Sequence, residues 1–402
     1  MKMKTLCVFI MGWLGLFFSN PNMLMAQAQA LSSETQVEVL GFGQNRNDAL
    51  QDALRNAVGE AAGVALVAET SMENFVVLKD AISTRTEGYV TAYQVISEGA
   101  KGENYEINIR ASVSLEPLKA DAEILARAIG GVRFLVMYDD RGRSAEEREI
   151  YDHAVDQVNA YLSQNGYRYI DNKRFQQLKN EARGIFEDSR GANEESYVQH
   201  LGLMADAQFI IFIRDINKDI RSEAFDTRTA KRISLNVRAY DNCTAEGLGT
   251  VNLKGEWSSS RSADEAMRSG INSAVNQGLP ELLRVFNSYI GNWVNNGTPF
   301  ELRFYESGSF RDFRDLRNKI VNDSKFGGQI EITAFDNYMK LNINFLDRPD
   351  DLAYLILDYA DEVPHFKNKR LDVRLIYGRQ INFAPQNTPV PELDKVKERK
   401  DE

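Results

Sequence analysis

The stretch VRFLVMYDDRGRSAEEREIYDHAVDQVNAYLSQNGYRYI, residues 132–170, decides the fold of the middle of the chain. Its first part, Val132–Tyr138, is nearly all apolar, which is typical of a strand buried on both faces of a sheet. Ser144 with Glu147 three residues later forms a capping box, so we expect a long helix to begin there. Tyr167–Ile170 is then a second strand. Strand, helix and strand in this order predict an α/β unit.

The predicted middle unit continues to residue 295. Its remaining expected elements, in chain order, are helices at 173–182 and 194–204, a third buried strand at 208–213, an antiparallel strand pair at 232–240 and 250–257, and helices at 262–275 and 280–294. Pro280 would stand in the first turn of the last helix, where its missing N–H is tolerated. We therefore expect residues 132–295 to form an α/β domain with a mixed sheet.

Before this unit, residues 35–116 predict a smaller β-α-β-β domain. A strand at Gln36–Leu40 precedes alanines and leucines that recur about every four residues from Ala49 to Ala62, as in an amphipathic helix. Two β-rich runs, Tyr89–Ile96 and Tyr105–Leu115, predict a hairpin. A connecting helix at 117–131 is expected to end at a Gly-Gly pair.

After the middle unit, residues 299–384 show a β-α-β-β-α-β pattern, which predicts a ferredoxin-like split β-α-β domain. The whole chain is thus expected to be α+β, with three small domains that meet at few contacts, so that 132–295 and 299–384 fold separately. Proline and charge in residues 385–402 predict a disordered tail. Aromatic residues gather early in the third unit and are expected in its core, with a ligand platform as the alternative: Phe300, Phe304, Tyr305, Phe310 and Phe313.

Two of these units resemble known envelope proteins. DALQDALRNAVGEAAGV (48–64) and GYVTAYQVISEGAKGENYEINIRASVSL (88–115) resemble the amino-terminal domain of flagellar assembly protein T and related outer-membrane lipoproteins. LGLMADAQFIIFIRDI (201–216), with Ala205-Asp206 before its strand, and the following strand pair are similar to the amino-terminal domain of TolB. The third unit departs from the small β domain that ends flagellar assembly protein T. The resemblance implies an adaptor or a component of a ring or complex in a bacterial envelope.

The first thirty residues predict the compartment. A basic start, an apolar run from Leu6 to Phe18 and small residues two apart up to Ala30 are typical of a cleaved signal peptide. Cys7 has no small-residue lipobox before it, and no later segment approaches 18 apolar residues. We therefore expect export to the periplasm without a lipid anchor or membrane span.

Composition narrows the partners. The net charge is −10, with 58 acidic against 48 basic residues, which argues against a nucleic-acid surface. The expected partners are envelope proteins, including a second copy of the chain. Cys243 is the only cysteine beyond the predicted leader, so an internal disulfide is excluded there. A core position near a turn is expected for it, and pairing between chains is the alternative.

No motif for a serine hydrolase, zinc protease, thiol redox centre or phosphate-binding loop is present in the sequence. The histidines His153, His200 and His365 are expected to be structural. Four aspartates follow predicted strands and form the one candidate metal site, for Mg²⁺ or Ca²⁺, if those strands are parallel: Asp139, Asp140, Asp171 and Asp215. The alternative is that they end strands and cap helices.

The sequence therefore predicts a non-catalytic exported protein with no cofactor, which acts in assembly through protein–protein contacts. Binding of a small envelope ligand, a glycan or peptide, in a cleft of the middle domain is the alternative. A metal-dependent hydrolase is the third possibility.

Overall fold

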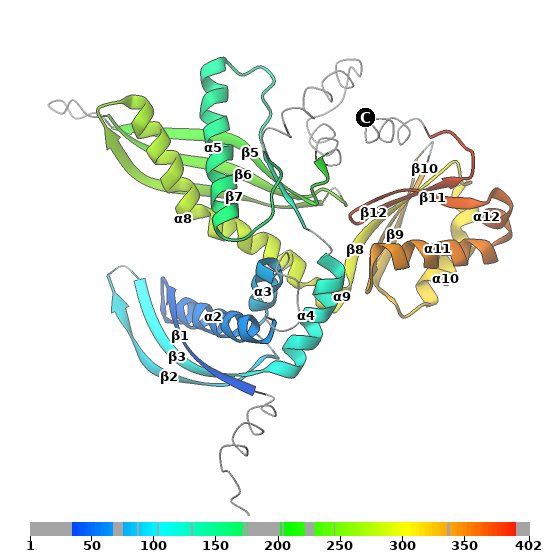
Figure 1. Ribbon diagram of the computed structural model, residues 1–402, viewed down its shortest axis with the longest axis horizontal. Helices are drawn as coiled ribbons and strands as arrows, with labels where there is room; N and C mark the ends of the chain where they lie inside the picture. Colours follow the sequence, from blue (N-terminus) through cyan, green and yellow to red (C-terminus); the bar gives the residue numbers. More distant parts are fainter. Residues whose placement is uncertain are drawn as a thin grey trace, which may run out of the picture.

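The chain forms an α+β protein with three sheets, as predicted, in a computed structural model (Figure 1). The structure describes residues 34–66, 75–86, 88–102, 104–129, 132–171, 175, 202, 205–221, 229–244, 246–335 and 338–390. The predicted leader, His200 and most of the helices expected at 173–182 and 194–204 lie outside these residues. Of the helices in the described ranges, none combines the length and the apolar content needed to cross a membrane.

The first unit is a three-stranded antiparallel sheet with helices on one face. Its elements are β1 (Glu34–Gly43), α2 (Arg46–Leu66), α3 (Phe75–Ser83), β2 (Val90–Lys101), β3 (Asn104–Ser114) and α4 (Leu115–Ile129), and the strand order is β1-β3-β2. The alanine stripe of α2 lies directly on the sheet, where Ala49 and Ala53 are completely buried. A Cβ placed on Gly41 would come within 2.2 Å of the Ala49 carbonyl oxygen. Small residues on both elements therefore permit this close packing.

The second unit is a mixed four-stranded sheet covered by two long helices on one face. Its elements are β4 (Phe134–Met137), α5 (Ala145–Gln164), β5 (Phe209–Arg221), β6 (Thr229–Asp241), β7 (Glu246–Ser260), α8 (Ala263–Gly291) and α9 (Trp293–Asn296). Strand β4 runs parallel to β5, and β6 lies between β5 and β7 and is antiparallel to both. The predicted capping box of Ser144 and Glu147 is present. The strand expected at Tyr167–Ile170 is reduced to a single parallel bridge between Phe134 and Tyr169.

Helix α8 differs from the sequence prediction, which divided it in two at Pro280. The proline lies inside one continuous helix of 29 residues. An interior proline removes one backbone hydrogen bond and costs about 3 kcal/mol. The apolar stripe of α8 continues on both sides of it, and Val275, Leu279, Leu282 and Phe286 are at most 1% exposed. Burial of this stripe at about 1.5–3 kcal/mol per side chain offsets that cost.

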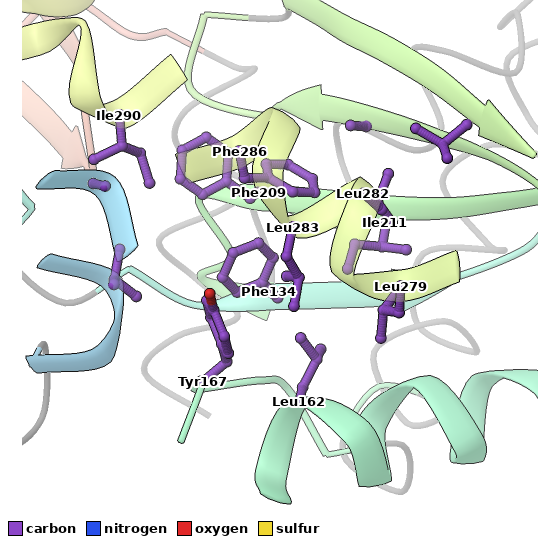
Figure 2. Close-up of a cluster of buried hydrophobic side chains, with 14 of the residues drawn as sticks. Phe134, Leu162, Tyr167, Phe209, Ile211, Leu279, Leu282, Leu283, Phe286 and Ile290 are labelled. Carbon is purple, nitrogen blue, oxygen red and sulfur yellow. The ribbon is translucent and has the colours of Figure 1, made fainter. Parts of the chain in front are cut away.

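One hydrophobic core joins the first two units. Figure 2 shows Phe134, Phe209 and Phe286 directed at one another beneath α8. The ring centroid of Phe286 lies 5.1 Å from that of Phe134 and 5.2 Å from that of Phe209. The same cluster of buried residues extends into α2, α3 and the first sheet. The expectation of few contacts between these two units is therefore wrong.

The third unit contains β8 (Thr298–Tyr305), a short 3-10 turn (Phe310–Phe313), α10 (Arg314–Asn322), β9 (Phe326–Ala334), β10 (Tyr338–Phe345), α11 (Pro349–Glu362), α12 (Pro364–Lys369), β11 (Leu371–Tyr377) and β12 (Gln380–Pro385). Its strand order is β11-β12-β8-β10-β9. Strand β10 lies between β8 and β9 and is antiparallel to both, which is the predicted split arrangement. Strand β12 then inserts between β11 and β8, parallel to β8, so the sheet gains a fifth strand.

The segment after residue 384 also differs from the prediction of a disordered tail. Pro385 still belongs to β12, and the Gln386 N–H donates to the Arg370 carbonyl oxygen at 2.9 Å. Val390 is buried in a small cluster with Tyr305 and Ala384. An apolar contact thus holds residues 385–390 to the sheet. Residues 391–402 lie outside the described part of the chain.

Candidate functional site

Two of the four candidate aspartates, Asp139 and Asp215, pair with a neighbouring arginine. The Asp139 carboxylate accepts hydrogen bonds from the Arg141 side chain at 2.8 and 2.9 Å. Asp215 lies in β5 rather than after it and pairs with Arg214 at 3.5 Å. Asp140 is buried. The Asp171 carbonyl oxygen accepts the Phe175 N–H at 3.0 Å, as at the start of a helical turn.

Arg143 binds the backbone just after β4 and that of β5. Its Nε donates to the Asp139 carbonyl oxygen at 2.7 Å, and its Nη2 donates to the Arg214 carbonyl oxygen at 3.2 Å. Its guanidinium lies 3.9 Å from the ring centroid of Tyr151. Within the described ranges, no group of three or more His, Cys, Asp and Glu side chains is arranged to hold a metal ion. The metal hypothesis therefore gains no supporting observation here.

The two described histidines make contacts within the fold. His153 on α5 lies 3.0 Å from the Asn272 Oδ1 on α8. His365 lies 2.5 Å from the Ser307 carbonyl oxygen and 3.8 Å from the Asp312 carboxylate.

Of the five aromatic residues singled out in the third unit, Phe310 is 62% exposed and the others are buried. The core explanation therefore holds for four of the five.

A buried polar cluster joins the second and third units. The hairpin between β11 and β12 inserts Arg379 into the second unit, where its Nη2 donates to the Asp241 carboxylate at 2.6 Å. Both side chains are at least 96% buried. The same carboxylate accepts the Tyr289 hydroxyl at 2.7 Å and the Cys243 N–H at 3.0 Å. The guanidinium lies 4.5 Å from the ring centroid of Trp293.

Glycine at position 378 permits the close approach of this hairpin to the second unit. Gly378 has a φ of +51°, and a Cβ there would come within 2.8 Å of the Cys243 sulfur. Tyr377 donates its hydroxyl to backbone carbonyls of the second unit, at 2.8 Å to that of Gly202. Burial raises the pKa of the Cys243 thiol to about 12, so the sulfur remains an unreactive core thiol, as expected for a cysteine near a turn. The cluster is therefore a structural joint.

A second junction, between the first and second units, is hollowed. A cleft of about 610 Å³ lies between α2 and α3 on one side and α5 and α8 on the other. An adjoining hollow of about 530 Å³ shares Arg55, Asn56, Lys79, Asp80 and Ser83 with it and continues to β1. A smaller hollow of about 390 Å³ lies within the second unit beside Tyr167–Asp171. The larger cleft is thus at a junction rather than within the predicted middle domain.

The cleft is lined by apolar, aromatic and charged groups. Tyr167 donates its hydroxyl to the Asp80 carboxylate and accepts the Asn287 Nδ2 at 3.0 Å. Burial raises the pKa of Asp80, and the hydrogen bond from Tyr167 partly opposes this shift. Three cationic side chains, those of Arg55, Lys79 and Arg284, line the same cleft.

The first sheet has an open edge. Strand β2 pairs with β3 alone among the described strands, and most of its residues are exposed along its length. Tyr93 is 49% exposed and Ile96 is 42% exposed. The eight residues Val90–Ser97 carry no charge and no proline. Natural edge strands are normally guarded by charge, proline or a bulge. This segment lacks the first two and carries two register shifts against β3, which are of the third kind.

The outer face of the same sheet also carries apolar groups. Leu40 and Phe42 on β1 are 45% and 49% exposed, on the face opposite α2. An ion pair between Arg110 and Glu38, 3.0 Å long, lies beside them.

Comparison with known proteins adds little to these observations. No protein-family model matches the chain, and no curated protein matches it significantly. Among solved structures, a similar chain is a candidate neuraminyllactose-binding hemagglutinin homolog from Helicobacter pylori. It is 10% identical, and the similarity covers 38% of this chain and 81% of the other, with a TM-score of 0.20. A score of this size carries no argument about function.

Sequence reasoning missed both junctions. The sequence predicts Cys243 near a turn but no partner for Arg379. The partner, Asp241, is 138 positions away in the chain, so no local pattern indicates the contact. The sequence signal for this junction is the pair Gly378-Arg379 between two β-rich runs, and such a pair predicts only an ordinary hairpin turn. The cleft depends on how α3 packs against α8, for which no local pattern exists.

Proposed function

We propose that the chain is a non-catalytic exported protein of a bacterial envelope that takes part in assembly through protein–protein contacts. The observation that carries this proposal is the open edge of β2, with its uncharged segment Val90–Ser97 and its exposed Tyr93 and Ile96. An unpaired edge offers backbone N–H and C=O groups to a strand of another molecule, and side chains supply selectivity. The resemblance to flagellar assembly protein T and TolB supports the same kind of role.

The proposed partner is an envelope protein or a second copy of the chain. Ile96→Lys introduces a charge at the edge, which disfavours strand addition. The test compares proteins captured from native envelope extract, and the mass of the purified protein, for wild type and this variant. Phe310→Lys, at an exposed apolar position of the third unit, is the matched control. The expected result is loss of a specific partner or oligomer in Ile96→Lys only.

A strictly monomeric wild type that captures no specific protein would contradict the proposal, as would equal losses in the two variants. The proposed periplasmic location has its own test in fractionation and intact mass. Cleavage near Ala30 is expected, and a retained leader or the added mass of acyl chains would exclude the proposed processing.

A second candidate function, binding of a small ligand, is favoured by the cleft between α3 and α8. The two functions use different faces of the first unit, since β2 is the sheet edge and the cleft lies at the junction with the second unit. The metal-dependent hydrolase has no comparable observation in its favour among the described residues.

A further inference from the structure

We propose that the cleft between α2–α3 and α5–α8 binds a small organic carboxylate with a flat apolar body. Its volume of about 610 Å³ lies within the range of small-molecule sites, roughly 300–1,000 Å³. Such sites occur preferentially where two structural units meet. This cleft has one wall from each unit, so both contribute to recognition. The inference is independent of the assembly role proposed for β2.

The charges of the lining favour an anion. Asp52 is already engaged, because it accepts the Phe42 N–H at 3.0 Å and pairs with Arg55 at 3.4 Å. Asp80 accepts the Tyr167 hydroxyl, and the buried position of its carboxyl disfavours the charged form. Lys79 and Arg284 line the cleft from opposite walls. Neither forms a close ion pair within the described part of the chain. The Lys79 charge acts on the neighbouring Asp80 carboxyl, whose burial disfavours its charged form, and Arg284 projects from the opposite wall.

The remaining lining favours an apolar body. Phe75 and Val76 come from α3, Pro280 and Leu283 from α8, and Tyr161 from α5. A flat ring between these walls would bury apolar area, and its carboxylate would reach the cationic groups at the rim. Charge-assisted hydrogen bonds of this kind are worth about 1.5–3 kcal/mol each, or roughly tenfold or more in affinity.

The test uses 2-naphthoate and its neutral amide, 2-naphthamide, which have nearly the same shape. Binding to the full-length protein is measured by saturation-transfer NMR and by calorimetric titration. The carboxylate is expected to bind about 100-fold more tightly than the amide, about tenfold for each of its two cationic contacts. Lys79→Met and Arg284→Met are each expected to weaken the carboxylate about tenfold and to leave the amide nearly unchanged. Lys367→Met, on α12 in the third unit, is the matched control and should bind like wild type.

Lys79 is half-buried and Arg284 is exposed, so both variants are expected to fold, and circular dichroism checks this. Equal affinity for the acid and the amide would overturn the proposed ligand class. Unchanged carboxylate binding in both cleft variants, or an equal loss in Lys367→Met, would place the binding elsewhere and overturn the site. Failure of 2-naphthoate to bind up to its solubility limit would also overturn the proposal. None of these outcomes affects the edge-strand test.

Discussion

Replacing Arg379 by methionine should strongly destabilise the protein, because it removes one partner of a buried ion pair. The guanidinium donates to Asp241 at 2.6 Å and to the Pro299 carbonyl oxygen at 3.2 Å. Losing one partner of such a pair typically costs about 3–5 kcal/mol. Methionine keeps part of the packing on Trp293, and Asp241 keeps its bonds from Tyr289 and the Cys243 N–H. We therefore expect the low end, about 3 kcal/mol.

The assay is urea unfolding followed by tryptophan fluorescence, since Trp293 lies under the guanidinium. Arg348→Met is the control, because Arg348 and Asp350 form an exposed pair of the same kind at 3.0 Å. That control should lose less than about 1 kcal/mol. The double variant of Arg379→Met with Asp241→Asn should lose less than the sum of the two single losses, since it leaves no uncompensated charge. A loss below about 1 kcal/mol for Arg379→Met would refute the reasoning.

Three further outcomes follow from named contacts. Ser144→Ala removes the side-chain acceptor of the Glu147 N–H and should lower the free energy of unfolding in urea by about 1 kcal/mol. An unchanged urea midpoint would mean that the helix does not need this cap. The raised pKa of Asp80 means that its contribution to stability is fully present below its ordinary pKa and lost as pH rises through the raised value. The stability of wild type relative to Asp80→Asn should therefore fall as pH rises from about 4 to 7, and a flat or rising difference in unfolding free energy would contradict this. Truncation after Gly297 removes Arg379 and leaves the Asp241 carboxylate without its cation. Adding Asp241→Asn to the truncated protein should therefore raise its thermal unfolding midpoint. A lower midpoint would show that water solvates the Asp241 charge in the truncated protein.

The sequence predicted elements whose causes are local. The helix after Ser144 begins at its capping box, and the alanines of α2 face the sheet as their spacing required. The prediction failed where distant parts of the chain decide the outcome. Pro280 continues a helix because the burial of residues on both sides outweighs its local preference. Strand β12 inserts beside β8 through a pairing that no local pattern specifies.

The candidate site was predicted less well than the fold, for a related reason. Aspartates that follow predicted strands are candidates because a parallel sheet would gather them, but Asp215 lies within a strand that continues to Arg221. Arginines from the same loops then bind the carboxylates or their backbone, as Arg141 and Arg143 do. The identity of a site depends on which side chains meet across units, and periodicity within one element does not carry that information.

The two junctions differ in the kind of contact that holds the units together. The first and second units share one apolar core, with the cleft of about 610 Å³ beside it at the junction. The second and third units are joined instead by one inserted hairpin whose buried contacts are polar, centred on Arg379 and Asp241. Polar contacts depend on direction as well as distance, so a small rotation of the hairpin would break them together. The third unit is therefore the one whose attachment should respond first to a partner or to destabilisation.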